Sequence, residues 1–239
     1  MPFPEVAADS LPWISVAQMR EVDRLMIEEF AIPLEQMMEN AGRSVAVLAR
    51  HLLGGDARGR RVLVLAGSGG NGGGGLAAAR HLLVADANVH VSLAAPPERL
   101  APVTRKQYET LVLLGVVPGT GSDGAELIID ALLGYGQKGV PSGDVASLVG
   151  QATGAPVLAL DVPSGLELET GRLHEPHVRA AATLTLALPK NSMRLGDAPD
   201  VVGELYLADI SVPPAVYKHL GVRYDSPFGR SPVVKIVRP

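Results

Sequence analysis

The apolar residues of the first fifty positions recur at helical spacing and predict two helices. Ser15 and Gln18 form a capping-box pair, which is typical of a helix start. Apolar residues then follow at helical intervals as far as Phe30. The same period returns from 34 to 52 and stops at Gly54, and glycine commonly ends helices. We therefore expect two amphipathic N-terminal helices ahead of the first strand.

Short, continuous apolar runs replace the helical period from Arg61 onward. The first run is bounded by glycine, and the same signature recurs four times, as expected for strands that are buried on both faces. The runs lie at 62–67, 89–95, 126–134, 156–165 and 182–189, with helical segments at 75–85, 103–114 and 144–152 between them. Strands that alternate with helices in this way form a mostly parallel sheet with helices on both faces. The pattern therefore predicts an α/β protein.

The C-terminal part holds one more predicted strand, followed by a segment with few structural signals. ELYLADI, from Glu204, has the composition of a sixth strand. SPFGRSPVVKIVRP, at 226–239, has three prolines and three basic residues, so we expect a tail at 223–239 with little regular structure. A chain of this length fits within one domain. We predict a single domain over 1–239, with its core at about 15–222.

The amino-acid composition and net charge exclude several kinds of partner and site. The 239 residues include 21 basic and 25 acidic side chains, a formal charge of −4, so no positive field favours nucleic acid or anionic membranes as partners. Since there is no cysteine, disulfides, thiolate metal sites and thiol nucleophiles are excluded. The first residues carry no basic segment, and no apolar run approaches the ~18 residues of a membrane span. We expect a cytoplasmic protein.

The densest candidate for ligand chemistry is the glycine-rich segment after the first strand. Seven glycines lie between Val62 and Leu83, where a buried strand passes into a helix. Glycine lets backbone N–H groups approach an anion, and the helix N-terminus adds its dipole, so a phosphate or pyrophosphate fits here. Gly67, Gly69 and Gly72 match G-x-G-x-x-G, although a tight structural turn remains an alternative. No acidic residue follows the second strand to bind a ribose, which disfavours a nicotinamide oxidoreductase.

Charged side chains also lie at the ends of three later runs. They are Asp130, Asp161 and, less distinctly, Lys190, at the edge where open α/β sheets place their sites. A carboxylate in such a position is expensive to desolvate unless it meets a cation or hydrogen-bond donors. Either aspartate alone could instead cap a local turn. Two of them at adjacent strand ends favour a functional site.

Several spaced motifs together resemble one protein family. In order, the chain contains QMREVD, MMENAGRSVA, GSGGNGGGGL, DALLGYGQKG, LDVPSGLELETG, TLTLALPK and GELYLADISVP. From Ser15 to about Val222 it is similar to the YjeF N-terminal domain family, the NAD(P)H-hydrate epimerases. The resemblance implies a three-layer α/β/α Rossmann-like sandwich and an isomerase that interconverts the R and S epimers of hydrated NADH or NADPH. It also implies a homodimer that is functionally paired with a separate NAD(P)H-hydrate dehydratase.

The resemblance further implies which residues form the site. Asp161 corresponds to the catalytic aspartate, and Lys138 is expected to lie near the substrate phosphates and to assist catalysis. Asn71, Asp130 and Ser164 match a potassium site, whose ligands are oxygen atoms, as a hard cation requires. The substrate-binding residues that it implies are Gly70, Asn71, Gly72, Gly73, Gly74, Gly134, Tyr135, Gly136, Gln137, Lys138, Gly139, Val140 and Asp161.

The glycine loop departs from the family pattern at two positions. The family's Asn-Asn-Gly-Gly-Asp-Gly falls on 70–75, where Gly70 replaces the first asparagine and Gly74 replaces the aspartate. This departure favours an alternative, a noncatalytic nucleotide-binding or scaffold module of the same fold. The residues that are retained favour the enzyme; they are Asn71, Asp130, Asp161 and Ser164.

The implied reaction sets a chemical requirement. Inverting a carbon that bears a hydroxyl beside a ring nitrogen needs proton transfer as the hydroxyl leaves and returns, and stabilisation of the electron-poor ring in between. The carboxylate of Asp161 suits both tasks. A monovalent cation polarises bonds weakly, so we expect potassium to hold the loops in place.

Overall fold

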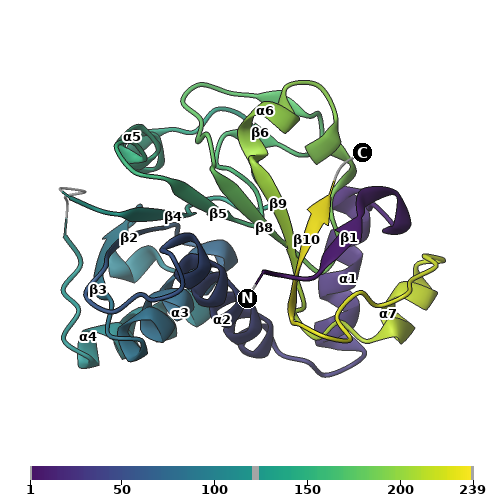
Figure 1. Cartoon of the computed structure of the whole chain (residues 1–239), viewed down its shortest axis with the longest axis horizontal. Helices are drawn as coiled ribbons and strands as arrows, with labels where there is room; N and C mark the ends of the chain where they lie inside the picture. Colours follow the sequence, from purple (N-terminus) through teal and green to yellow (C-terminus); the bar gives the residue numbers. More distant parts are fainter. Residues whose placement is uncertain (1, 120–123, 238–239) are drawn as a thin grey trace.

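An eight-stranded, mostly parallel sheet runs through the residues that the computed structural model describes, 2–119 and 124–237 (Figure 1). Its strand order is β1-β10-β9-β8-β5-β4-β2-β3. The mutually parallel strands are β2 (Arg61–Ala66), β3 (Asn88–Leu93), β4 (Leu127–Ala131), β5 (Val157–Leu160), β8 (Ala182–Leu186) and β9 (Glu204–Ala208). β10 (Val233–Val237) is antiparallel to β9, and β1 (Glu5–Ala7) pairs with β10 in parallel. The predicted α/β class is confirmed.

Helices cover both faces of the sheet and make the fold a three-layer sandwich (Figure 1). One face carries α2 (Leu34–Leu52), α3 (Gly70–Val84) and α4 (Pro102–Leu113), and the other carries α5 (Gly143–Gln151) and α6 (Ala198–Val202). α1 (Val16–Glu28) and α7 (Pro214–His219) pack on each other. Short 3₁₀ turns lie at Ala8–Ser10, Pro97–Arg99 and Asn191–Arg194, and β6 (Leu166–Glu167) pairs with β7 (Arg172–Leu173) as a small separate hairpin. Among the described helices, none is both long and apolar enough to cross a membrane.

The side chains of β2 alternate between the two layers of helices. Val62 and Val64 belong to the core that β2 shares with α2 and α3. Leu63 and Leu65 belong to the core on the other face, which includes residues of α5. All four side chains are buried. The continuous apolar runs in the sequence therefore arise because each strand faces helices on both sides.

The predicted helix starts and ends agree with the structure at α1 and α2. The Ser15 hydroxyl accepts a hydrogen bond from the Gln18 backbone N–H at 3.1 Å, and the Gln18 side chain accepts one from the Ser15 backbone N–H at 2.9 Å. This reciprocal pair satisfies two backbone donors at the start of α1. α2 ends at Leu52, just before Gly54.

The expectation of an irregular C-terminal tail at 223–239 is wrong for its last described residues. Val233–Val237 form β10, which pairs with β9 through Val234 and Leu207. Pro227, Gly229 and Pro232 precede the strand, and within its β-branched run Val233, Val234 and Ile236 are buried. The core also extends before residue 15, because β1 pairs with β10 and Ile14 is fully buried.

Helix α3 begins earlier than the sequence predicts. It starts at Gly70, five residues before the expected start at Gly75, so most of the glycine-rich segment is helical. Glycine is a poor helix former, but here close packing requires it. A Cβ at Gly72 would lie 1.9 Å from the Gly67 carbonyl oxygen, and a Cβ at Gly75 would lie 2.4 Å from the Ala131 Cβ. No residue from Gly67 to Gly75 has a positive φ, so the glycines allow close approach rather than a left-handed turn.

Candidate functional site

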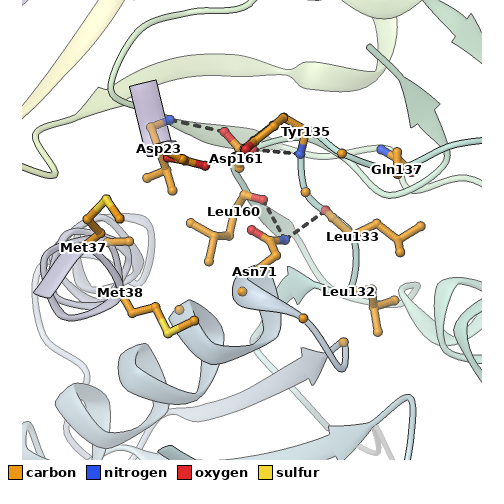
Figure 2. A pocket seen from close by; sticks show the side chains of 18 of the residues that line it. Asp23, Met37, Met38, Asn71, Leu132, Leu133, Tyr135, Gln137, Leu160 and Asp161 are labelled. Carbon is orange, nitrogen blue, oxygen red and sulfur yellow. Dashed lines mark hydrogen bonds between the residues drawn. The ribbon is translucent and has the colours of Figure 1, made fainter. Parts of the chain in front are cut away.

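A pocket of about 540 Å³ opens at the carboxyl ends of β2, β4 and β5 (Figure 2). β3 and β4 lie on opposite sides of β2, so the chain reverses direction across the sheet at this point. Such a switch point is where open α/β sheets bind ligands. The lining residues come from four parts of the chain: Met19, Asp23, Leu34, Met37, Met38 and Ala41; Gly67–Asn71 and Gly74; Leu132–Gln137 and Val145; and Leu160, Asp161, Leu186 and Ile210.

One wall of the pocket is the turn from β2 into α3. Gly69 caps α3 in an extended conformation, and the first backbone N–H groups of this fifteen-residue helix lie at the pocket. The Thr104 hydroxyl donates to the Gly69 carbonyl at 2.8 Å, and the Ala101 N–H donates to the Ser68 carbonyl at 2.9 Å, so α4 fixes the turn. A helix N-terminus presents unpaired N–H groups and a positive dipole end. This wall can therefore bind an anionic group such as a phosphate.

Asp161 is held rigidly at the end of β5. It is only 3% exposed and has a positive φ of 68°, which is uncommon for a residue other than glycine. Its Oδ2 accepts a hydrogen bond from the Tyr135 N–H at 2.9 Å, and its Oδ1 lies 2.5 Å from Lys190 Nζ. Lys190 is 1% exposed and also donates to Thr185 Oγ1 at 3.1 Å and to the Leu186 carbonyl at 2.9 Å. The carboxylate therefore lies at the pocket with a buried cation as its partner.

A second carboxyl group, that of Asp23, reaches the same pocket from α1 (Figure 2). Its Oδ2 accepts a hydrogen bond from the Tyr135 hydroxyl at 2.5 Å. Burial is the main cause that raises the pKa of Asp23 above its ordinary value, whereas the Tyr135 hydrogen bond opposes this rise. Burial also raises the pKa of Tyr135, and the nearby Asp23 charge adds to that effect. Tyr135 thus donates through its backbone to Asp161 and through its side chain to Asp23.

Asp130 lies behind the pocket and is fully buried. Its carboxylate accepts hydrogen bonds from the Ser164 N–H at 2.8 Å, the Ser164 hydroxyl at 2.7 Å and the Leu132 N–H at 3.2 Å. Burial raises the pKa of Asp130 to about 6. Among the described residues, no basic side chain lies within 4.0 Å of it. A buried carboxylate without a cationic partner suits a bound cation.

Asn71 and Ser164 both bond the backbone of one residue, Leu133. The Asn71 amide donates to the carbonyls of Leu133, at 2.9 Å, and Leu160, at 3.1 Å (Figure 2). The Ser164 hydroxyl accepts a hydrogen bond from the Leu133 N–H at 3.1 Å. Ser164 also contacts Asp130 directly, so the backbone of Leu133 links Asn71 to the Ser164–Asp130 pair, and all three residues expected to bind potassium lie near this segment. Oxygen ligands of this kind fit a hard cation.

The residues expected to bind substrate fall into two groups. Those that line the pocket are Gly70, Asn71, Gly74, Gly134, Tyr135, Gly136, Gln137 and Asp161. Gly72 and Gly73 are buried and do not line the pocket, and a Cβ at Gly73 would lie 2.7 Å from the Met38 sulfur. Lys138, Gly139 and Val140 do not line the pocket. The Lys138 side chain is 62% exposed and pairs with Glu169 at 3.6 Å.

Sequence reasoning did not select Asp23 or the apolar wall of the pocket. Met37 and Met38, from α2, lie opposite the polar group in Figure 2. A signal for Asp23 exists in the sequence, because it occupies the same helical face as Met19 and Met26, both buried. A carboxylate on an apolar helix face needs a partner inside the fold. The partner role of Lys190 could have been inferred in the same way, since lysine is almost never fully buried unpaired.

These features define the class of protein. A parallel sheet with helices on both faces, a glycine-rich strand-to-helix turn and polar groups at the switch point are typical of Rossmann-like nucleotide-binding folds. A family model, that of the YjeF-related protein N-terminus, matches residues 34–192. The chain belongs to this family.

Known proteins that are similar to the chain include enzymes and a solved structure. An NAD(P)H-hydrate epimerase of Dehalogenimonas lykanthroporepellens is 42% identical, over 95% of this chain and 93% of that protein. One of Truepera radiovictrix is 38% identical, over 94% and 100%. A bifunctional NAD(P)H-hydrate repair enzyme of Moorella thermoacetica is 39% identical over 84% of this chain, but the match spans only 40% of that protein. The crystal structure of the yeast protein ynu0 has a TM-score of 0.80 and 25% identity, and the match covers 95% of this chain and all of that one.

Proposed function

We propose that the protein is an NAD(P)H-hydrate epimerase, an isomerase that interconverts the R and S epimers of hydrated NADH and NADPH. One observation carries the proposal: relatives of that name match over nearly their whole length and nearly the whole of this chain. The pocket agrees with it, because a dinucleotide needs an anion-binding turn and this reaction needs a proton-transfer group. A pocket of about 540 Å³ also lies within the usual range for small-molecule sites.

Asp161 is the proposed proton-transfer group. When the hydroxyl at C6 of the reduced ring leaves, the ring nitrogen and C6 develop positive charge, and a nearby carboxylate stabilises it. When water returns to C6, the same carboxylate can accept its proton. Lys190 and the Tyr135 N–H fix the orientation of Asp161, so little reorganisation accompanies the reaction.

The turn from Gly67 to Asn71 is the proposed binding site for the pyrophosphate of the substrate. Its donors are backbone N–H groups at the start of α3. Replacement of the family's asparagine and aspartate by Gly70 and Gly74 leaves these backbone donors in place. We therefore assign anion binding to the backbone and expect the orientation of the ring end to depend on the other walls.

Asn71, Asp130 and Ser164 are the proposed ligands of a potassium ion. The proposal is supported by the Ser164–Asp130 hydrogen bond, by the link of Asn71 and Ser164 to the backbone of Leu133, and by the buried carboxylate of Asp130. When bound, the ion supplies positive charge that holds the loops after β2, β4 and β5 together. Asp130 itself needs no part in proton transfer, since it does not line the pocket.

Cellular context and assembly are also proposed from the family. A homodimer, a cytoplasmic location and functional pairing with an NAD(P)H-hydrate dehydratase follow from the resemblance in sequence motifs. The bifunctional relatives support the last point, because their names describe hydrate repair by one longer protein. Light scattering in solution tests the dimer, and mixing with a dehydratase tests the pairing.

The direct test is turnover of the purified hydrate. The R epimer of hydrated NADH is incubated with the protein, and formation of the S epimer is followed by chromatography against a sample without protein. We expect a rate far above the spontaneous one, and a loss of that excess in the Asp161→Asn variant. Binding of the hydrate without any turnover favours the noncatalytic module, which Gly70 and Gly74 make the second candidate.

A further inference from the structure

We propose that Asp23 is a second proton-transfer residue of this pocket, which gives its proton to the departing hydroxyl while Asp161 receives the proton of the returning water. This inference rests on the proposed epimerase function. It assigns different tasks to the two carboxyl groups that line one pocket. The assignment follows from the surroundings of the two groups, which favour the carboxylate form at Asp161 and the protonated form at Asp23.

Tyr135 places the two carboxyl groups in one unit. Its backbone N–H donates to Asp161 Oδ2 at 2.9 Å, and its hydroxyl donates to Asp23 Oδ2 at 2.5 Å. Figure 2 shows the side chains of Asp23, Tyr135 and Asp161 grouped on one side of the pocket, away from Met37 and Met38. Both carboxyl groups can therefore lie near the same carbon of a bound ring.

The surroundings of Asp161 favour the carboxylate form. The buried ammonium of Lys190 lies 2.5 Å from its Oδ1. Two backbone N–H groups, of Tyr135 and Leu186, also donate to it, at 2.9 Å and 3.4 Å. An ammonium and N–H groups act only as donors, so the Asp161 carboxylate is the acceptor in each of these contacts. Asp161 is thus arranged to receive a proton.

The surroundings of Asp23 favour the protonated form. Within the described residues, no basic side chain lies within 4.0 Å of its carboxyl group. The two arginines that flank it on α1 have other partners: Arg20 pairs with Glu169, and Arg24 pairs with Glu21 and two further glutamates. Among the described side chains only the Tyr135 hydroxyl donates to it, and this one hydrogen bond favours the charged form less than burial opposes it.

The charged and titratable groups that face Asp23 act in opposite directions. Burial raises its pKa most, and the charge of Asp161 adds to the rise. The Tyr135 hydrogen bond and the ammonium of Lys190 lower it, and the net result is a raised pKa. Two carboxyl groups that lie in unlike surroundings in one site commonly divide the acid and base roles.

One inversion at C6 takes the following course. The Asp23 carboxyl gives its proton to the C6 hydroxyl, the C6–O bond breaks, water leaves, and the lone pair of the ring nitrogen forms a double bond to C6. A water then adds to the other face of C6, its electron pair closes the C–O bond, the nitrogen regains its lone pair, and the excess proton goes to Asp161. Return of that proton to Asp23 through solvent restores the starting state. No oxidant or reductant is consumed.

The first test compares three variants for epimerisation of hydrated NADH. General acids typically contribute about 10²–10⁴-fold in rate, so Asp23→Asn should lower kcat by that order with little change in KM. Glu28→Gln is the matched control, since Glu28 is an exposed carboxylate on the same helix and its variant should turn over at the wild-type rate. Asp23→Glu should retain part of the activity because it keeps a carboxyl group.

The second test uses Tyr135→Phe and the pH profile, a readout that a purely structural role for Asp23 does not move. The Tyr135 hydroxyl stabilises ionised Asp23. Its removal should therefore shift the high-pH decline of kcat/KM to higher pH, while Glu28→Gln leaves that decline in place. If Asp23→Asn does not fold, this test still shows whether Asp23 transfers a proton.

The outcomes separate the two proposals. If wild-type protein does not epimerise the hydrate, the proposed function itself fails. If wild-type protein is active and Asp23→Asn keeps its rate to within threefold, or if Tyr135→Phe leaves the high-pH decline unmoved, the role of Asp23 is refuted and Asp161 acts without it.

Discussion

Lys190 Nζ lies 2.5 Å from Asp161 Oδ1, and neither residue is more than 3% exposed. Lys190 comes from the segment after β8, whereas Asp161 follows β5, the neighbouring strand. Removing one partner of a buried ion pair leaves an uncompensated charge, which costs about 3–5 kcal/mol. Activity and stability are therefore coupled at this pair.

Single and double substitutions can separate the two effects. Asp161→Asn should abolish the rate above background and also lower the free energy of unfolding, because Lys190 loses its carboxylate partner. The double variant Asp161→Asn/Lys190→Met should regain most of that stability and no activity. Urea unfolding and the epimerase assay measure the two quantities. Full stability in Asp161→Asn alone would argue that Lys190 finds another partner.

Potassium should stabilise the folded protein if it binds at Asn71, Asp130 and Ser164. A ligand at 100 times its dissociation constant contributes about 2.7 kcal/mol, which corresponds to roughly 5–10 °C in Tm for a protein of this size. The melting temperature in potassium chloride should exceed that in tetramethylammonium chloride at equal ionic strength. In Asp130→Asn the difference between the two salts should vanish, whatever the Tm of that variant. Equal Tm values in both salts for the wild type would contradict the proposed site.

The glycine-rich turn should tolerate change at some positions and not at others. A Cβ at Gly70 meets only the end of Met38, at 3.7 Å, and one at Gly74 meets the end of the Leu160 side chain at 2.9 Å. Gly70→Asn/Gly74→Asp should therefore fold. A restored charge-assisted hydrogen bond is worth roughly 1.5–3 kcal/mol, so affinity for the hydrate should rise about ten- to a hundredfold.

Gly72→Ala is the contrasting variant for this turn. Its Cβ would lie 1.9 Å from the Gly67 carbonyl oxygen, a backbone atom that cannot move aside. Its Tm should fall well below that of the double variant. If Gly72→Ala folds as well as the wild type, close packing is not the reason for the glycine.

Asp23→Asn should become more stable relative to the wild type as pH rises. Because the pKa of Asp23 is raised in the folded protein, the folded state holds a proton that the unfolded chain releases near pH 4. Wild-type stability therefore falls as pH rises from about 4 through the folded pKa, and is constant above it. Asparagine does not titrate, so the difference between the two unfolding free energies should grow over this range in urea titrations. A constant difference would mean that Asp23 titrates normally.

Much of the fold could be predicted because buried strands have a distinctive pattern. The run from Val62 to Gly67 is apolar on both faces of the strand, and no helix period competes with it. The sequence does not predict β10, because prolines and basic residues near Val233–Val237 are typical of an irregular tail and the apolar run itself is short. The early start of α3 was missed because glycine propensity argues against a helix, and only tertiary packing against Met38 and Ala131 overrides it.

The site could be predicted only in part, for a geometric reason. Asp130 lies near the carboxyl end of β4 and Asp161 directly follows β5, the neighbouring parallel strand, so their proximity follows from topology. Asp23 is on a helix far from them in sequence, and nothing in local spacing indicates that Tyr135 joins it to Asp161. The exposure of Lys138 could not be predicted either, because it depends on the path of a loop in which the preceding residue, Gln137, is buried.

The close packing of α3 limits which parts of the pocket can change during evolution toward other substrates. Gly67, Gly72 and Gly75 cannot gain a side chain without displacing backbone or core atoms, so the backbone of the anion-binding wall has almost no freedom to move, although Gly70 and Gly74 can accept side chains. The opposite wall holds Met37 and Met38, whose unbranched thioether side chains adapt readily to different neighbours. Adaptation to a bulkier or smaller reduced ring should therefore accumulate on the methionine side, while Gly67, Gly72 and Gly75 stay constant among descendants with different preferences.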